Sequence, residues 1–144
     1  MITPKISVLM LTYNHAPYLK EAIEGVLMQQ TDFDFELIIC NDCSPDSSEQ
    51  VIQPFVDRHP EIISYFRHKK NIGFIENQRF AFKKANGKYI AYCEGDDYWT
   101  CPNKLQFQYD FLEKNSEFVM TTARNLVLHQ DSGKITNDGK DLIF

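Results

Sequence analysis

Short apolar runs alternate with segments of helical spacing along most of this 144-residue chain, and this alternation restricts its fold more than any other feature. Apolar runs without polar alternation are typical of strands buried on both faces, as in parallel sheets. Strands are expected at residues 6–11, 35–40, 62–66, 89–93 and 118–122. Helices are expected at 17–30, from 47 onward, at 74–85 and from 100 onward. Strands that alternate with helices predict an α/β fold with a doubly wound, mostly parallel sheet and helices on both faces.

Several local signals refine this picture. Ser47 and Gln50 have the spacing of a capping box, and Pro54 should kink or shorten the helix that follows. Asn86-Gly87 is expected to cap the end of the third helix. Residues 125–136 have the pattern of a hairpin that turns at 131–133.

Composition limits the possible functions. Hydrophobic residues make up 43% of the chain and charged residues 24%, which is ordinary for a globular domain. The net charge of −5 argues against nucleic-acid binding, which needs a basic surface. The sequence contains no apolar run of membrane-spanning length and no N-terminal pattern of a signal peptide. We therefore expect a cytoplasmic protein.

Four cysteines allow a second interpretation. Cys40, Cys43, Cys93 and Cys101 could form a four-thiolate zinc site, but the second pair has a wide spacing. Cys40 and Cys93 end apolar runs, where a free cysteine is a small buried hydrophobe. We expect reduced thiols and keep the zinc-stapled domain as an alternative.

Polar residues follow the first and fourth expected strands. In doubly wound sheets, ligands bind beyond the carboxyl ends of the strands, where the strand order reverses. With a strand order of 3-2-1-4, the crevice lies between the first strand, which ends near Tyr13, and the fourth, which ends near Asp96 and Asp97.

This acidic segment suggests a metal site. Glu94, Asp96 and Asp97 are oxygen ligands of the kind that Mg²⁺ or Mn²⁺ takes beside substrate phosphates. Tyr13 offers an aromatic face for a base and Asp42 an acceptor for a base or ribose. The alternatives are a solvated acidic turn, a Tyr13 packed in the core and an Asp42 that caps a helix. The sequence contains neither a dinucleotide-binding fingerprint nor a P-loop.

A series of motifs in order makes the chain similar to a known family. The matching segments lie at 6–14, 41–46, 71–73, 79, 85–90, 94–97 and 104–106. Together they resemble the N-terminal, nucleotide-sugar-binding half of the family 2 glycosyltransferases with the GT-A fold.

This resemblance implies inverting transfer of a sugar from a nucleotide-diphospho-sugar, with UDP the expected nucleotide, to an acceptor hydroxyl in polysaccharide biosynthesis. The donor nucleotide would bind Thr12, Tyr13, Asn14, Asp42, Asn71, Arg79 and Asp96. A Mn²⁺ or Mg²⁺ ion would bind Asp97, Asp96 and, as a third ligand, Glu94 in a motif of the DXD type.

Two positions depart from the family pattern. Asn41 replaces the first carboxylate of the usual Asp-Asp-Gly-Ser motif, and Glu94 replaces an Asp. The catalytic base of the family lies far beyond the metal motif, so we expect it beyond Phe144 and expect this chain alone to turn over poorly. The expected domains are a donor-binding core at 1–122 and the start of an acceptor-side half at 123–144.

Other functions and partners stay open at this point. The chain could be a non-catalytic nucleotide-sugar-binding module, or a nucleotidyltransferase on a related fold. The acceptor, whether glycan, lipid-linked or protein, and the oligomeric state are not encoded in these motifs. Relatives that work on lipid-linked glycans suggest peripheral association with the inner face of the membrane.

Overall fold

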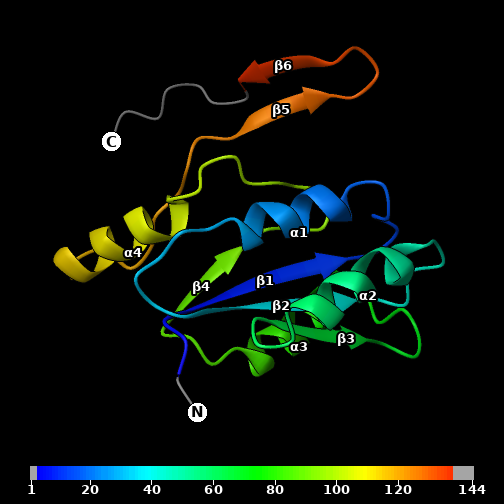
Figure 1. Ribbon diagram of the computed structural model, residues 1–144, viewed down its shortest axis with the longest axis horizontal. Coiled ribbons are helices and arrows are strands. Elements are labelled where there is room, and N and C mark those ends of the chain that lie inside the picture. Colours follow the sequence, from blue (N-terminus) through cyan, green and yellow to red (C-terminus); the bar gives the residue numbers. More distant parts are fainter. Residues whose placement is uncertain (1–2, 138–144) are drawn as a thin grey trace. The chain divides into compact units, whose positions relative to one another are not determined.

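A computed structural model describes residues 3–137 of the chain (Figure 1). Strands and helices alternate as the apolar pattern predicts. Their order is β1 (Ile6–Thr12), α1 (Leu19–Leu27), β2 (Phe35–Asn41), α2 (Ser48–Arg58), β3 (Ile63–Arg67), α3 (Phe74–Lys84), β4 (Tyr89–Tyr92), α4 (Lys104–Lys114), β5 (Leu126–His129) and β6 (Lys134–Asn137). Two compact units result, one that ends at Phe107 and one that begins at Gln108.

The first unit contains a four-stranded parallel sheet with the order β3-β2-β1-β4, which confirms the predicted order. Ile6 of β1 is in register with Phe35 of β2 and with Tyr89 of β4. Every residue of β1 is buried, as an unbroken apolar run at the centre of a parallel sheet requires.

Helices cover both faces of this sheet. The chain moves from β1 to β2 to β3 in one direction across the sheet and then crosses back to β4. Because such crossovers are right-handed, α1 and α2 lie on one face and α3 on the other. The face under α3 holds a core cluster of Leu9, Leu11, Ile38, Cys40 and Ala81. The doubly wound architecture is therefore confirmed.

The turn between α3 and β4 differs from the expected glycine cap. Asn86 does cap the helix, but through its side chain, whose Nδ2 donates to the carbonyl of Lys84. Gly87 instead packs against β1: a Cβ there would lie 2.5 Å from the backbone nitrogen of Ser7. The Ser7 hydroxyl accepts hydrogen bonds from the N–H groups of Asn86 and Gly87 and donates to Glu36. Gly87 is thus needed for close approach of two backbones.

The predictions for α2 need two corrections. Ser47 is the N-cap residue, but its side chain makes no capping hydrogen bond, so the capping box is absent. The Asp46 carboxylate caps the helix instead, because its Oδ1 accepts from the N–H and hydroxyl of Ser48. The helix also continues to Arg58, four residues beyond Pro54, so proline does not shorten it.

The second unit contains a hairpin at the expected place and lacks an expected strand. β5 and β6 pair antiparallel, with a left-handed Gly133 in the turn between them. Residues 118–122 form no strand, and Val119 and Met120 are 91% and 77% exposed. Apolar composition alone predicted this strand, but a strand also needs a paired neighbour, and within residues 3–137 none pairs with this segment.

Candidate functional site

A cleft of about 430 Å³ opens in the first unit at the carboxyl ends of the strands. The segments that follow β1, β2, β3 and β4 all contribute to it. Its lining residues are Leu11, Thr12, Tyr13, His15, Asp42, Asn71, Gly73, Phe74, Asn77, Glu94 and Asp96. This is where the topology of a doubly wound sheet places ligands, so the location of the site expected from the sequence agrees with the structure.

Most of the residues nominated from the sequence meet in this cleft. Those that line it are Thr12, Tyr13, Asp42, Asn71, Glu94 and Asp96. Three others lie outside its lining. Arg79 lies on α3, where its guanidinium pairs with Glu76 at 2.8 Å. Asn14 has a left-handed backbone, with φ of 63°, and its N–H donates to the Ser44 hydroxyl. Asp97 ends the acidic turn, and its role in binding stays a prediction.

Two aromatic side chains present free surface to the cleft. Tyr13 is 47% exposed and Phe74 is 53% exposed, although both are large and apolar. Packing in the core, the alternative considered for Tyr13, is therefore wrong. Exposed aromatic faces on a cleft wall are suited to stacking on a planar ring.

Asp42 is bound at the start of α3. It is 3% exposed, and its two carboxylate oxygens accept hydrogen bonds from the N–H groups of Ile72 at 2.8 Å and Gly73 at 2.9 Å. Gly73 is the N-cap of α3, so the carboxylate also lies at the positive end of the helix dipole. Asp42 therefore holds the segment 71–73, which forms one wall of the cleft.

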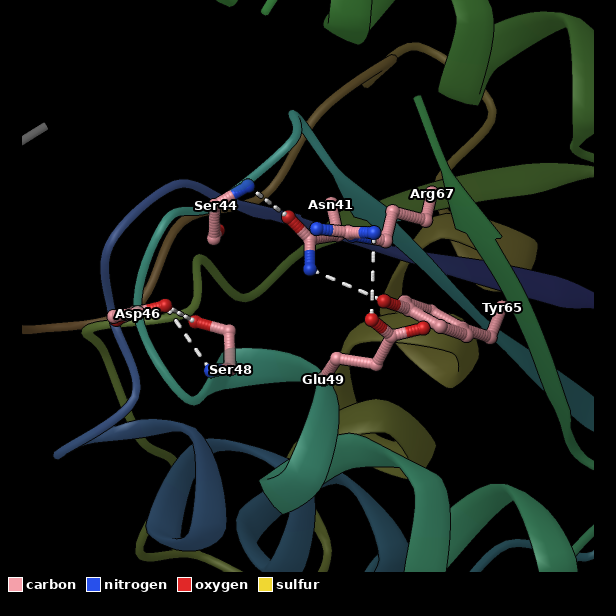
Figure 2. A network of polar contacts seen from close by, with 7 residues as sticks. All are labelled: Asn41, Ser44, Asp46, Ser48, Glu49, Tyr65 and Arg67. Carbon is pink, nitrogen blue, oxygen red and sulfur yellow. Dashed lines mark hydrogen bonds and ion pairs between the residues drawn. The ribbon is translucent and has the colours of Figure 1, made fainter. Parts of the chain in front are cut away.

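A polar network behind the cleft shapes the loop after β2, as Figure 2 shows. Asn41 is fully buried; its Oδ1 accepts from the N–H of Ser44, and its Nδ2 donates to the Tyr65 hydroxyl. An amide can both accept and donate here, which a carboxylate cannot. The departure from the family carboxylate at position 41 thus gives a buried group whose oxygen and nitrogen are both hydrogen-bonded.

Asp46 connects the loop after β2 to the loop after β1 through hydrogen bonds. Its Oδ2 accepts from the N–H of Ala16 at 2.9 Å, while its Oδ1 accepts from Ser48. Burial alone would raise the pKa of Asp46, but the hydrogen bonds from Ser48 and Ala16 together lower it. Asp46 is therefore charged over the whole range near neutral pH.

The acidic turn packs directly onto β1. The N–H of Gly95 donates to the carbonyl of Leu11 at 3.0 Å, and the N–H of Asp97 donates to the carbonyl of Glu94 at 3.1 Å. Burial raises the pKa of Glu94 and of Asp97, and the nearby Asp96 raises both further. A cation at this turn would relieve that repulsion.

The charge of the cleft is negative. Asp42, Glu94 and Asp96 line it, and none of the lining residues that the structure describes is a lysine or an arginine. Between residues 3 and 137, no three His, Cys, Asp or Glu side chains are close enough to share one metal ion. Mg²⁺ typically binds through one or two protein carboxylates together with substrate phosphates, and so does not need a cluster of three protein ligands.

The four cysteines do not assemble a zinc site. All four lie in the described part of the chain as free thiols, and they form no cluster of metal-binding geometry. Burial raises the pKa of both Cys40 and Cys93 to about 12, so neither thiol is ionised at neutral pH. This confirms the prediction that Cys40 and Cys93 are buried hydrophobes.

The sequence reasoning missed five lining residues: Leu11, His15, Gly73, Phe74 and Asn77. His15 and Phe74 directly follow the motifs at 12–14 and 71–73, so proximity to those motifs was the available signal. Asn77 is buried in α3, where its Nδ2 donates to the carbonyl of Cys40 and its Oδ1 contacts His68. Nothing in the sequence distinguishes it from a surface asparagine.

Across residues 3–137, none of the helices is both long and apolar enough to cross a lipid bilayer.

Comparison with known proteins identifies the family. The family model described as "Glycosyl transferase family 2" matches residues 7–128. A protein of Rickettsia bellii named "Uncharacterized glycosyltransferase" is 35% identical over 138 residues, which are 96% of this chain and 18% of that protein. Across the similar curated proteins, this chain spans between 10% and 45% of their length.

Solved structures with the same fold are glycosyltransferases of the GT-A type, as expected. The Pyrobaculum calidifontis mannosyltransferase PcManGT, in complex with GDP-Man and Mn²⁺, superimposes with a TM-score of 0.68 at 20% identity. It covers 76% of this chain, which spans 32% of that protein. Staphylococcus aureus TarS in complex with UDP-GlcNAc gives a TM-score of 0.67 at 26% identity, with coverages of 76% and 31%.

Proposed function

This chain belongs to the glycosyl transferase family 2, and we propose that it is the donor-binding part of an inverting, metal-dependent enzyme that transfers a sugar from a nucleotide-diphospho-sugar to an acceptor hydroxyl. One observation supports the proposal that donor binding depends on a metal ion. The cleft combines exposed aromatic surface with three carboxylates and, among the described lining residues, contains no lysine or arginine. Repulsion between these carboxylates and a diphosphate supports entry of the diphosphate together with a cation.

The places of the side chains in the cleft support the following proposed roles. Tyr13 would stack on the base and Asn71 would offer polar groups to the base and ribose, whereas the hydroxyl of Thr12 is buried and is a weaker candidate. Asp96 would bind the metal or the ribose, with Glu94 or Asp97 as a second carboxylate. When bound, Mg²⁺ or Mn²⁺ would supply Lewis-acid stabilisation of the charge on the leaving diphosphate. Arg79 and Asn14 are the weakest of the nominated donor ligands, because neither lines the cleft.

The nucleotide is expected to be UDP. The support is the likeness to TarS, whose structures hold UDP and UDP-GlcNAc. The fold-level likeness to a mannosyltransferase in complex with GDP-Man makes GDP the alternative. We propose that the acceptor-side residues and the catalytic base correspond to parts of the longer relatives that this chain does not span.

Calorimetric titration of UDP and GDP, each with and without Mn²⁺, tests the proposal. We expect UDP to bind only with Mn²⁺, and Asp96→Ala and Asp97→Ala to abolish this binding. Asp57→Ala, on the exposed face of α2, is the matched control and should bind normally. Failure of both nucleotides to bind the unmodified chain with Mn²⁺ would refute the donor site.

Transfer itself is tested separately from binding, on a protein as long as the matched relatives. Release of UDP from a UDP-sugar in the presence of an acceptor, lost in Asp97→Ala, would support the enzyme. Metal-dependent nucleotide binding without any transfer would favour the non-catalytic binding module instead.

A further inference from the structure

His15 lies between the first strand and the acidic turn. Its Nε2 is 3.7 Å from Oδ2 of Asp96, and the two side chains are 24% and 50% exposed. Its Nδ1 faces inward: a Cβ built on Gly95 would lie 2.9 Å from Nδ1 and 2.9 Å from the Thr12 hydroxyl. The ring therefore contacts the acidic turn at its buried side and at its exposed side.

Two buried polar atoms at this contact have no partner. Nδ1 of His15 and the hydroxyl oxygen of Thr12 are both shielded from solvent and, in the described part of the chain, neither makes a hydrogen bond. Thr12 is 2% exposed and lines the cleft. Such orphaned groups are costly, and each one calls for an explanation such as a functional role or a bound ion or water.

The unpartnered Nδ1 bears on which ring nitrogen faces Asp96 with an N–H. A buried N–H without an acceptor is rarer in proteins than a buried acceptor without a donor. With Nδ1 as the buried acceptor, the N–H of the ring lies on Nε2, the nitrogen that is 3.7 Å from Asp96.

Few other contacts fix the orientation of the Asp96 side chain. The turn is tied to β1 by the hydrogen bond from Gly95 to Leu11, which holds the backbone but not the carboxylate. No lysine or arginine of the described chain lines the cleft, and the ring nitrogen Nε2 of His15 is the positively polarised group that lies 3.7 Å from this carboxylate.

We propose that His15 is a positioning residue of the donor site, which holds the acidic turn against β1 and orients the Asp96 carboxylate for the metal and the diphosphate. The inference rests on the proposed function and adds to it a residue that acts through Asp96. Outer partners of this kind typically change metal affinity by about 10- to 100-fold when removed.

Three substitutions of His15 separate this role from a packing role. In His15→Gln the amide nitrogen reaches about the place of Nε2, whereas in His15→Asn it reaches about the place of Nδ1; His15→Ala removes both. His59→Ala is the control, because Nδ1 of His59 lies 3.8 Å from Glu61 in a similar pair at the end of α2. The affinity for UDP with Mn²⁺ is measured by calorimetry, and that for uridine without metal by NMR titration.

We expect His15→Ala and His15→Asn to weaken the Mn²⁺-dependent binding of UDP about 10-fold or more. His15→Gln should recover most of it, and the affinity for uridine should not change. In Gly95→Ala, the added Cβ would lie 2.9 Å from Nδ1 of His15 and should displace the ring. This variant should therefore also lose affinity for UDP with Mn²⁺ and keep its affinity for uridine.

The outcomes distinguish the two proposals. If the unmodified chain fails to bind UDP with Mn²⁺, the proposed function itself is wrong. If it binds and His15→Ala binds equally well, or if uridine and UDP lose affinity together, the positioning role of His15 is overturned. Equal loss in His15→Gln and His15→Asn would also contradict it.

Discussion

Replacement of Asp42 by asparagine tests how the cleft wall is held. The structure assigns both carboxylate oxygens to backbone N–H groups, those of Ile72 and Gly73, at 2.8 and 2.9 Å. An asparagine of the same shape can accept only one of these hydrogen bonds. Its NH₂ group would then face the other N–H, and both would be donors. The substitution therefore changes one atom and leaves the packing intact.

The expected cost is large for a single atom. Asp42 is 3% exposed, so water has little access to the N–H groups that it binds, although the N–H of Gly73 also donates to Oδ1 of Asn71 at 3.0 Å. A hydrogen bond to a charged group contributes about 1.5–3 kcal/mol, and an unsatisfied buried donor costs about 1–3 kcal/mol. Because these two terms describe partly the same loss and Gly73 keeps a second acceptor, we expect Asp42→Asn to lower the free energy of unfolding by about 1–3 kcal/mol.

Urea denaturation followed by Trp99 fluorescence measures this change, since Trp99 is the single tryptophan of the chain. Asp57→Asn is the control, because its carboxylate accepts from Gln53 on an exposed helix face and should change stability by about 0.5 kcal/mol or less. Nucleotide binding should weaken in Asp42→Asn as the wall at 71–73 loosens. Equal urea midpoints for Asp42→Asn and the unmodified chain would refute the structural assignment of this carboxylate.

Two further predictions concern stability. The lowered pKa of Asp46 means that its charge stabilises the fold at pH values above the unfolded value of 3.8, and that this contribution is lost as the pH falls through the folded pKa. In urea titrations, the stability advantage over Asp46→Asn should therefore shrink below pH 3.8, and a constant difference would contradict the role of the Ser48 and Ala16 hydrogen bonds. Gly87→Ala should lower the free energy of unfolding by about 1–3 kcal/mol, because its Cβ would meet the Ser7 backbone at 2.5 Å. Gly133→Ala is the control, because a Cβ there meets no other atom and the only cost is an unfavourable φ of 64°. If Gly133→Ala lowered the free energy of unfolding more than Gly87→Ala, the backbone of β1 would be able to move away from residue 87 at little cost.

Local patterns predicted most of the fold because burial in a parallel sheet leaves a strong local signal. β1 is buried along its whole length, and its sequence is an unbroken apolar run. The hairpin of β5 and β6 is likewise encoded by its turn residues. By contrast, residues 118–122 have strand-like composition and form no strand, because pairing depends on a neighbour that the segment itself does not specify.

The site residues show the same division between what local patterns predict and what depends on distant parts of the chain. The order of the motifs indicated that Tyr13, Asp42 and Asp96 would meet at one edge of the sheet, since the carboxyl ends of parallel strands share that edge. This is a property of topology, which a sequence with clear strand boundaries reveals.

The amino-acid sequence by itself thus determined the layers of the fold and the strand order, which the motifs after the strands indicated. It also determined the edge of the sheet at which the cleft opens. Only the tertiary structure decided what each side chain does there. The carboxylate of Asp42 accepts hydrogen bonds at the start of α3, Arg79 pairs with Glu76 outside the cleft lining, and His15 lies against Gly95. The physical reason is separation along the sequence. Apolar periodicity is a pattern of a few neighbouring residues, whereas the partners of Asp42 and His15 lie 30 and 80 positions further along the chain.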